Sequence, residues 1–154
     1  MTISPIDGSQ RKAAWIAGLA CPISFVTVVA VNFGIFERLI VSGNPAETAR
    51  NILAHETLFR IGIAGFLVYC VGVVVLLTAL YVILKPVDQN LALLAAFGRL
   101  VHGFTWLLVT LNLFTALRLL SGADYSRAFG SDQLPVVARL YLSGFDAYYV
   151  GLLF

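Results

Sequence analysis

Charged residues are scarce in this sequence. Asp, Glu, Lys and Arg make up 12% of the 154 residues, whereas hydrophobic residues make up 60%. A soluble domain carries about a quarter charged residues. The net charge is only +2, and the basic residues are scattered along the chain, whereas a nucleic-acid surface needs them clustered on one face. We therefore expect an integral membrane protein whose partner is the lipid bilayer, with no nucleic-acid partner.

Cysteine and the motifs of hydrolytic enzymes are scarce too. Cys21 and Cys70 lie inside apolar runs, and neither has a second Cys or a His at the spacing of metal ligands. The chain contains no GxSxG elbow, no HExxH zinc pair and no glycine-rich phosphate loop. We therefore interpret both cysteines as small buried hydrophobic residues, and we expect neither a metal site nor an enzyme.

Long apolar segments are abundant instead. They cover residues 13–36, 61–84, 91–117 and 134–154. At ~1.5 Å per residue, a helix of this length crosses a hydrocarbon core of ~30 Å. We predict an all-α fold, a polytopic transmembrane helix bundle in which a polar tail (1–12) precedes a single domain (13–154). Three segments are clear spans, and the fourth, which carries Arg139 and Asp146, is expected to be a further span.

The connection between the first two spans has the signals of a short helix. Asn44 can cap it, Pro45 suits its first turn, and Glu47 falls at the third helical position. We predict an interfacial helix at about residues 45–56 that leads into the second span. His55, Glu56 and Arg60 follow closely and form a candidate polar cluster at the membrane surface.

Small residues recur on the first two predicted spans. Ala13, Ala17 and Cys21 are spaced every four residues in the first span, and Gly62 and Gly65 lie at the entry of the second. Small side chains allow the backbones of membrane helices to approach closely. We therefore expect helix contacts at these faces.

The third span carries ionisable residues where a charge is costly. Arg99, His102, Trp106 and Thr110 share one stripe at helical spacing, which predicts that the stripe faces other helices or a cavity. Arg99 lies ~12 Å from the start of its span and Asp146 lies ~18 Å from the opposite side, which is the same depth in a ~30 Å core. Arg99 and Asp146 are thus a candidate intramembrane ion pair.

Three interpretations of this stripe stay open. The ion pair can serve to fix which helices are neighbours, because breaking a buried pair is costly. Alternatively, Arg99, His102 and Asp146 can line a polar pocket for an anionic head group, a solute or a proton path. His102 is also a candidate tetrapyrrole ligand, because Gly98 leaves room for a flat ring and Trp106 can pack against its edge.

Two stretches carry a family resemblance. AETARNILAHETLFRIGIAG and ALYVILKPVDQNLALLAAFGRLVHG resemble the bacterial membrane family known as domain of unknown function 4386. The resemblance runs from about Arg11 to the end of the chain. It implies a helical bundle of which this chain is the N-terminal two thirds, and it places Arg60 and Arg99 in family motif positions. Because the family has no assigned activity, the resemblance implies a fold and no chemistry.

The function that we expect is that of a structural or accessory subunit of a membrane assembly, because small-residue faces invite partner subunits. The alternative is a small-solute transporter or lipid-binding protein that uses the Arg99, His102 and Asp146 pocket. A third alternative is tetrapyrrole binding (haem or chlorophyll) through His102, and no other cofactor is predicted. We expect several passes through the bacterial inner (cytoplasmic) membrane, with a cytoplasmic N-terminus because Arg11 and Lys12 flank the first span.

Overall fold

Three long helices dominate the structure. The computed structural model describes residues 7–122 and 133–153, the stretch 145–153 as backbone only. The long helices are α1 (Gly8–Val31), α4 (Glu56–Leu84) and α5 (Gln89–Ser121). Each of them, α1 together with its continuation to Leu39, is long and apolar enough to cross a membrane. The predicted all-α membrane fold is confirmed.

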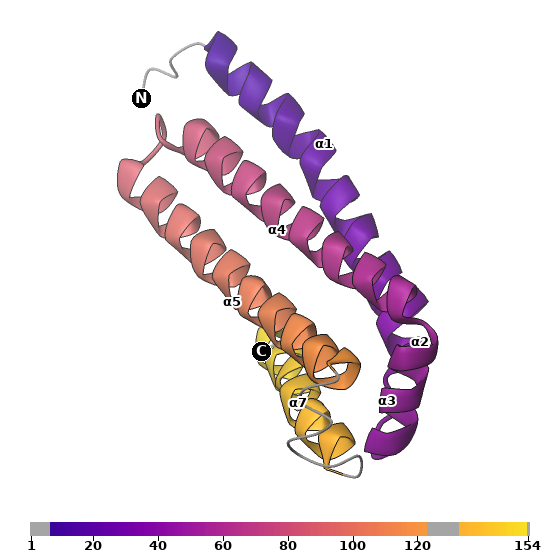
Figure 1. Ribbon diagram of the computed structural model, residues 1–154. Helices are drawn as coiled ribbons and strands as arrows, with labels where there is room; N and C mark the ends of the chain where they lie inside the picture. The colour runs from indigo at the N-terminus through magenta and orange to yellow at the C-terminus, as the bar shows by residue number, and fades with distance from the viewer. Residues whose placement is uncertain (1–6, 123–132, 154) are drawn as a thin grey trace.

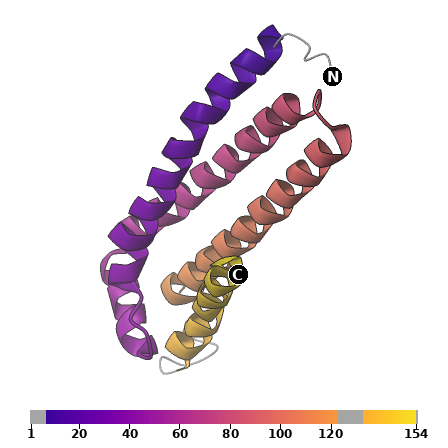
Figure 2. The same ribbon diagram turned by 180° about the vertical axis from the view of Figure 1, so that it is seen from behind.

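The long helices lie side by side in an open layer (Figure 1). α1 packs against α4, and α4 packs against α5. The last helix, α7 (Leu134–Leu153), packs against α5 and against the short helix α3 (Pro45–Ala54). In both views α7 lies beside the C-terminal half of α5 (Figure 1, Figure 2). The central helix of the layer is therefore α4, which has a long neighbour on each side.

The first helix begins earlier than predicted. Asp7 caps α1, because its carboxylate accepts a hydrogen bond from the Gly8 amide at 2.7 Å, while the Asp7 amide donates to Oε1 of Gln10 at 3.0 Å. Reciprocal bonds of this kind provide acceptors for backbone N–H groups in the first turn, which have no partner within the helix. Residues 8–12 of the predicted polar tail are consequently helical.

A wide turn ends the first span. Residues Asn32–Phe36 form the π-helical turn η1, which continues into α2 (Glu37–Leu39). The Asn32 side chain donates to the carbonyl of Val28 at 3.0 Å, and this bond competes with the regular backbone pattern. This turn was not expected from the sequence. Phe36, its last residue, is buried in the core, where it is 1% exposed.

The connecting helix α3 confirms its predicted start. Oδ1 of Asn44 accepts from the Glu47 amide at 3.1 Å, and the Asn44 amide group donates to the Glu47 carboxylate at 3.0 Å. The helix ends at Ala54, and the non-helical backbone of His55 (φ −124°, ψ 39°) separates it from α4, which begins at Glu56. α3 therefore ends slightly before the predicted residue 56.

Glycines on α4 allow α1 to approach closely. A Cβ atom built on Gly65 lies 2.5 Å from Cγ2 of Val31, and one on Gly62 lies 2.8 Å from Cζ of Phe36. A Cβ on Gly72 collides with the Ser24 hydroxyl. The predicted small face at the entry of this span is confirmed, and Gly72 extends it.

The small residues of α1 are divided between two faces. Ala13 is buried, whereas Cys21 is exposed on the outward side of the helix. The prediction that both cysteines are buried is wrong for Cys21 and holds in part for Cys70, which is half-buried. The physical reason is that an apolar residue of a membrane helix can face lipid as well as protein.

The predicted fourth span corresponds to α7. Leu134, Ala138 and Leu142 are spaced every four residues and are buried, so that one stripe of α7 packs inward. The three helices that meet the length and hydropathy of a membrane span in the described residues do not include α7. Its crossing of the membrane therefore stays a prediction.

Candidate functional site

An aromatic and polar cluster joins α4 to α5. Phe66 and Tyr69 come from α4, and His102 and Trp106 come from α5. The ring centroids of Trp106 lie 5.0 Å from Phe66 and 5.3 Å from Tyr69, and the Trp106 and Tyr69 rings meet edge to face. His102 lies one turn before Trp106, with its ring centroid 6.5 Å away. Edge-to-face packing is a favoured arrangement of aromatic rings, so these contacts orient the polar atoms of the cluster.

Tyr69 and His102 form the hydrogen bond of this cluster. The Tyr69 hydroxyl lies 2.9 Å from Nε2 of His102, and both side chains are half-buried. The tautomer of His102 decides which of the two donates. A tyrosine and a neutral histidine together hold two donors, and this bond uses one of them. Either tautomer therefore leaves one N–H or O–H donor for a further group.

Trp106 carries a second donor. The Trp106 side chain is 6% exposed. Its Nε1–H group has no acceptor within the described part of the chain. Leaving a buried donor without a partner costs ~1–3 kcal/mol. An acceptor placed at this group would remove that cost.

Arg99 supplies a positive charge next to the cluster. It precedes His102 by three residues on the same face of α5 and is half-buried. Its charge lies close enough to interact electrostatically with both Tyr69 and His102. Among the described residues it has no ion-pair partner; the ion pair found there joins Arg60 to Glu56. The stripe predicted on this helix does face inward, because Trp106 and Thr110 are buried.

The helix register argues against the predicted pair of Arg99 and Asp146. α5 continues to Ser121, beyond the predicted end at residue 117, and α7 begins from that end of α5 (Figure 1). Along their axes, Arg99 lies ~33 Å from the end of α5, whereas Asp146 lies ~18 Å from the start of α7. The two residues are thus at different levels. The side chain of Asp146 lies outside the described residues.

Of the predicted surface cluster of His55, Glu56 and Arg60, the last two form an ion pair. The Arg60 guanidinium donates to Oε1 of Glu56 from Nη2 at 2.6 Å and from Nε at 2.9 Å. Both side chains are exposed, at 58% and 36%, and such pairs contribute little to stability. His55 turns elsewhere, with its Nδ1 atom 3.2 Å from the Asn51 carbonyl. We therefore assign no site to these residues.

The surroundings of His102 give the tetrapyrrole alternative no support. Nε2 of His102 bonds to the Tyr69 hydroxyl, so a metal at this nitrogen requires the loss of that bond. The Trp106 and Tyr69 rings pack against each other beside the imidazole. The room expected at Gly98 is present, because a Cβ atom built there meets nothing within 4 Å, so it is the hydrogen bond of His102, not lack of space, that does not favour this alternative.

Tyr69 is the polar member of the cluster that was not expected from the sequence. Its signal was a hydroxyl-bearing side chain in the middle of the predicted second span, which is otherwise almost purely apolar. A tyrosine in such a position needs a hydrogen-bond partner. The sequence contains this signal, but it does not contain the register that places Tyr69 opposite His102.

Comparison with known proteins identifies a family. The family model described as "Domain of unknown function (DUF4386)" matches residues 16–154. This is most of the chain, so the finer expectations, a start near Arg11 and an N-terminal two-thirds segment, are slightly off. Neither the curated proteins nor the solved structures provide a match. The chain therefore belongs to the membrane family of domain of unknown function 4386.

Proposed function

We propose that this membrane protein is not an enzyme and that it binds a carboxylate or phosphate group between α4 and α5. The observation that carries the proposal is the buried Trp106 N–H, which has no acceptor among the described residues and lies one turn from His102. Ionisable groups in membrane helices are costly, and they are kept where they bind or conduct something. The structural alternative, an Arg99–Asp146 pair, stays an untested prediction, because the side chain of Asp146 lies outside the described residues; the backbone levels of the two residues do not favour it.

The hydrogen-bond donors of the cluster favour an anionic ligand. Arg99 and Trp106 can only donate hydrogen bonds, and the Tyr69–His102 pair retains one donor. A ligand over His102 must therefore supply acceptors, and the Arg99 charge favours a negative one. Bonds between charged donors and carboxylates or phosphates are stronger than neutral ones.

The depth of the site limits the kind of ligand. A helix as long as α5 measures ~50 Å, whereas the hydrocarbon core is ~30 Å thick. With α5 centred in the membrane, Arg99 lies ~5 Å and Trp106 ~15 Å inside the core. This is below the level of lipid head groups. The ligand is thus a small organic anion that crosses the membrane, or an amphiphile whose acidic end enters between α4 and α5.

Reconstitution distinguishes these two sources. The purified protein is placed in lipid vesicles, and uptake of a labelled small carboxylate is compared with binding of a fatty carboxylate. We expect either uptake or binding to be observed. We expect Arg99→Gln and Trp106→Phe to weaken it at least tenfold, because the first removes the positive charge and the second removes the indole donor. Arg60→Gln is the matched control and should leave it unchanged. Equal behaviour of Arg99→Gln and Arg60→Gln contradicts the proposal.

A second candidate, an accessory subunit, is favoured by the outward face of α1. Ala14, Gly18 and Cys21 share this face and are exposed, and a Cβ atom on Gly18 meets nothing within 4 Å. Small residues are typical of helix interfaces in membranes. A subunit should co-purify at fixed stoichiometry in mild detergent, and Gly18→Leu should release it. A chain that elutes alone in every mild detergent excludes this role.

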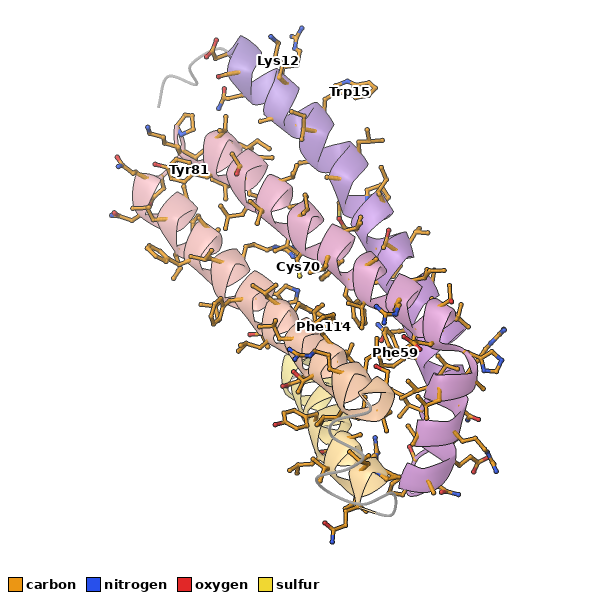
Figure 3. All side chains as sticks on the ribbon, viewed as in Figure 1. Lys12, Trp15, Phe59, Cys70, Tyr81 and Phe114 are labelled. Carbon is orange, nitrogen blue, oxygen red and sulfur yellow. The ribbon has the colours of Figure 1, made fainter. Side chains whose placement is uncertain are left out.

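The orientation is proposed from the charges at one end of the layer. Arg11, Lys12 and Lys85 lie where α1 begins and α4 ends, and Lys12 and Tyr81 mark this end in Figure 3. Basic residues next to short connections favour the cytoplasmic side. We therefore propose a cytoplasmic N-terminus in the bacterial inner membrane. Labelling of a cysteine placed at residue 87 by a membrane-impermeant reagent in intact cells would contradict it.

A further inference from the structure

α1 and α4 separate toward the N-terminal end of α1 (Figure 1). Two adjoining cavities of about 470 and 330 Å³ lie between them, and Ile16 and Val75 line both. We call this continuous space the α1–α4 furrow. Its lining residues include Lys12, Ile16, Ile23, Val71, Val75 and Val82. The furrow lies on the opposite face of α4 from His102 and Trp106, and it is separate from the proposed anion site.

The furrow is closed at one end and open at the other. Its last lining residues are Thr27 and Val68, and just beyond them Val31 packs against Gly65 and closes it. Its open end is at Lys12, 15 residues before Thr27 on α1, which corresponds to ~22 Å along the helix. One leaflet, with its head groups, contributes about half of a bilayer that is ~40–45 Å thick. The length of the furrow therefore fits one lipid of one leaflet, its acyl chain and its head group together.

The open end has the charge that a phospholipid head group requires. Lys12 lines the furrow, and Arg11 lies beside it on the exposed surface of α1. Two acids belong to this end of the layer, and both cap helices: Asp7 accepts from the Gly8 amide and the Ser9 hydroxyl, and Asp88 accepts from the first amides of α5. Lys85 lies at the same end of the layer, with its ammonium 5.8 Å from the centre of the Tyr81 ring. Basic side chains between membrane helices attract anionic head groups.

We propose that the α1–α4 furrow binds one anionic phospholipid, with an acyl chain along Ile16 and Val75 and the phosphate beside Lys12. The apolar walls hold the chain, and the basic residues select the head group. Annular lipids, by contrast, are held by unspecific contact with helix faces. The proposal thus predicts retention of one lipid, with a preference for negative charge.

Native mass spectrometry in mild detergent tests the proposal. The protein is purified with an equal mixture of phosphatidylglycerol and phosphatidylcholine that share the same acyl chains. We expect one phosphatidylglycerol per chain, retained at least fivefold more than phosphatidylcholine. Lys12→Ala should reduce this preference roughly fivefold, which corresponds to one surface charge near anionic lipid. Ile16→Trp fills the furrow and should abolish retention of both lipids.

Val26→Trp is the matched control. Val26 and Ile16 are both exposed residues of α1, at 64% and 51%, but only Ile16 lines the furrow. Equal retention of lipid by the two tryptophan variants overturns the proposal. So does an unchanged head-group preference in Lys12→Ala, which tests the charge without altering the furrow. A bound polypeptide in place of the lipid assigns the furrow to a protein partner and also overturns the proposal.

Discussion

The two sides of α4 make contact in opposite ways. Toward α1, Gly62, Gly65 and Gly72 remove side chains, so that Val31 and Ser24 pack against the backbone. Toward α5, large rings fill the space, and Tyr69 forms a hydrogen bond with His102. We call these contacts the glycine seam and the aromatic seam.

This difference shows how a membrane helix acquires neighbours. Lipid tails are as apolar as leucine, so burial from water does not drive helices together. The forces that remain are close packing and interhelical hydrogen bonds. Helix α4 packs closely against α1 on one side and forms a hydrogen bond with α5 on the other. The aromatic seam holds Arg99, the Trp106 N–H and the Tyr69–His102 pair next to one another. The proposed anion site therefore belongs to this seam, whereas the glycine seam brings the backbones of α1 and α4 close together.

The largest expected effect comes from Phe66, which bridges both seams. Its ring stacks on Phe36 at 5.0 Å and contacts Trp106 at 5.0 Å, and it is fully buried. Phe66→Ala should destabilise the protein by ~3–5 kcal/mol, because it leaves a cavity. Thermal unfolding in detergent measures this loss. Phe104→Ala, at an exposed position of α5, is the control, and similar losses for the two variants contradict the packing described here.

The glycine seam should respond next. Gly65→Leu places a side chain where Val31 lies, and such overpacking costs ~1–3 kcal/mol. Gly98→Leu, on an exposed face with open space, should be neutral or slightly stabilising, because glycine is a poor helix former. Unfolding in rising fractions of a denaturing detergent compares the stability of the two variants. If Gly65→Leu is tolerated as well as Gly98→Leu, α1 does not depend on close approach.

The hydrogen bond of the aromatic seam should contribute less. Tyr69→Phe is expected to cost ~0.6 kcal/mol and at most ~1.7 kcal/mol, which is the range for such bonds between membrane helices. The double-mutant cycle with His102→Phe isolates the bond, because Tyr69→Phe should have no effect once His102 is replaced. Additive losses from the two substitutions would show that the side chains do not interact.

The smallest effect is expected outside both seams. Arg60→Ala removes an exposed ion pair with Glu56, and i,i+4 pairs of this kind contribute ~0.3–0.5 kcal/mol. The same unfolding measurement in low and high salt checks the value, since the contribution should disappear at high salt. A loss as large as that of Gly65→Leu would mean that the seams do not dominate the stability.

The local features of this fold could be predicted from the sequence. The register between neighbouring helices, that is, which residues of two helices lie at the same height, could not. The cap of α3 by Asn44 and the close approach at Gly65 depend on neighbouring residues or on side-chain size alone. The level of Asp146 depends on where α7 meets α5. Counting depth from the apolar ends placed this residue opposite Arg99, because it assumed that each helix begins and ends at the edge of the hydrocarbon core. α5 extends further, and packing decides the register.

The most direct test of the anion site uses Trp106 itself as the reporter. The chain has two tryptophans, and Trp15 is 76% exposed and points away from α4 (Figure 3). In Trp15→Phe, the fluorescence of Trp106 is followed during titration with a medium-chain carboxylate and with the alcohol of the same length. We predict a saturable change with the carboxylate alone, weakened at least tenfold by Arg99→Gln, as loss of a charged hydrogen bond implies. An equal response to the alcohol, or an unchanged titration in Arg99→Gln, would contradict the account.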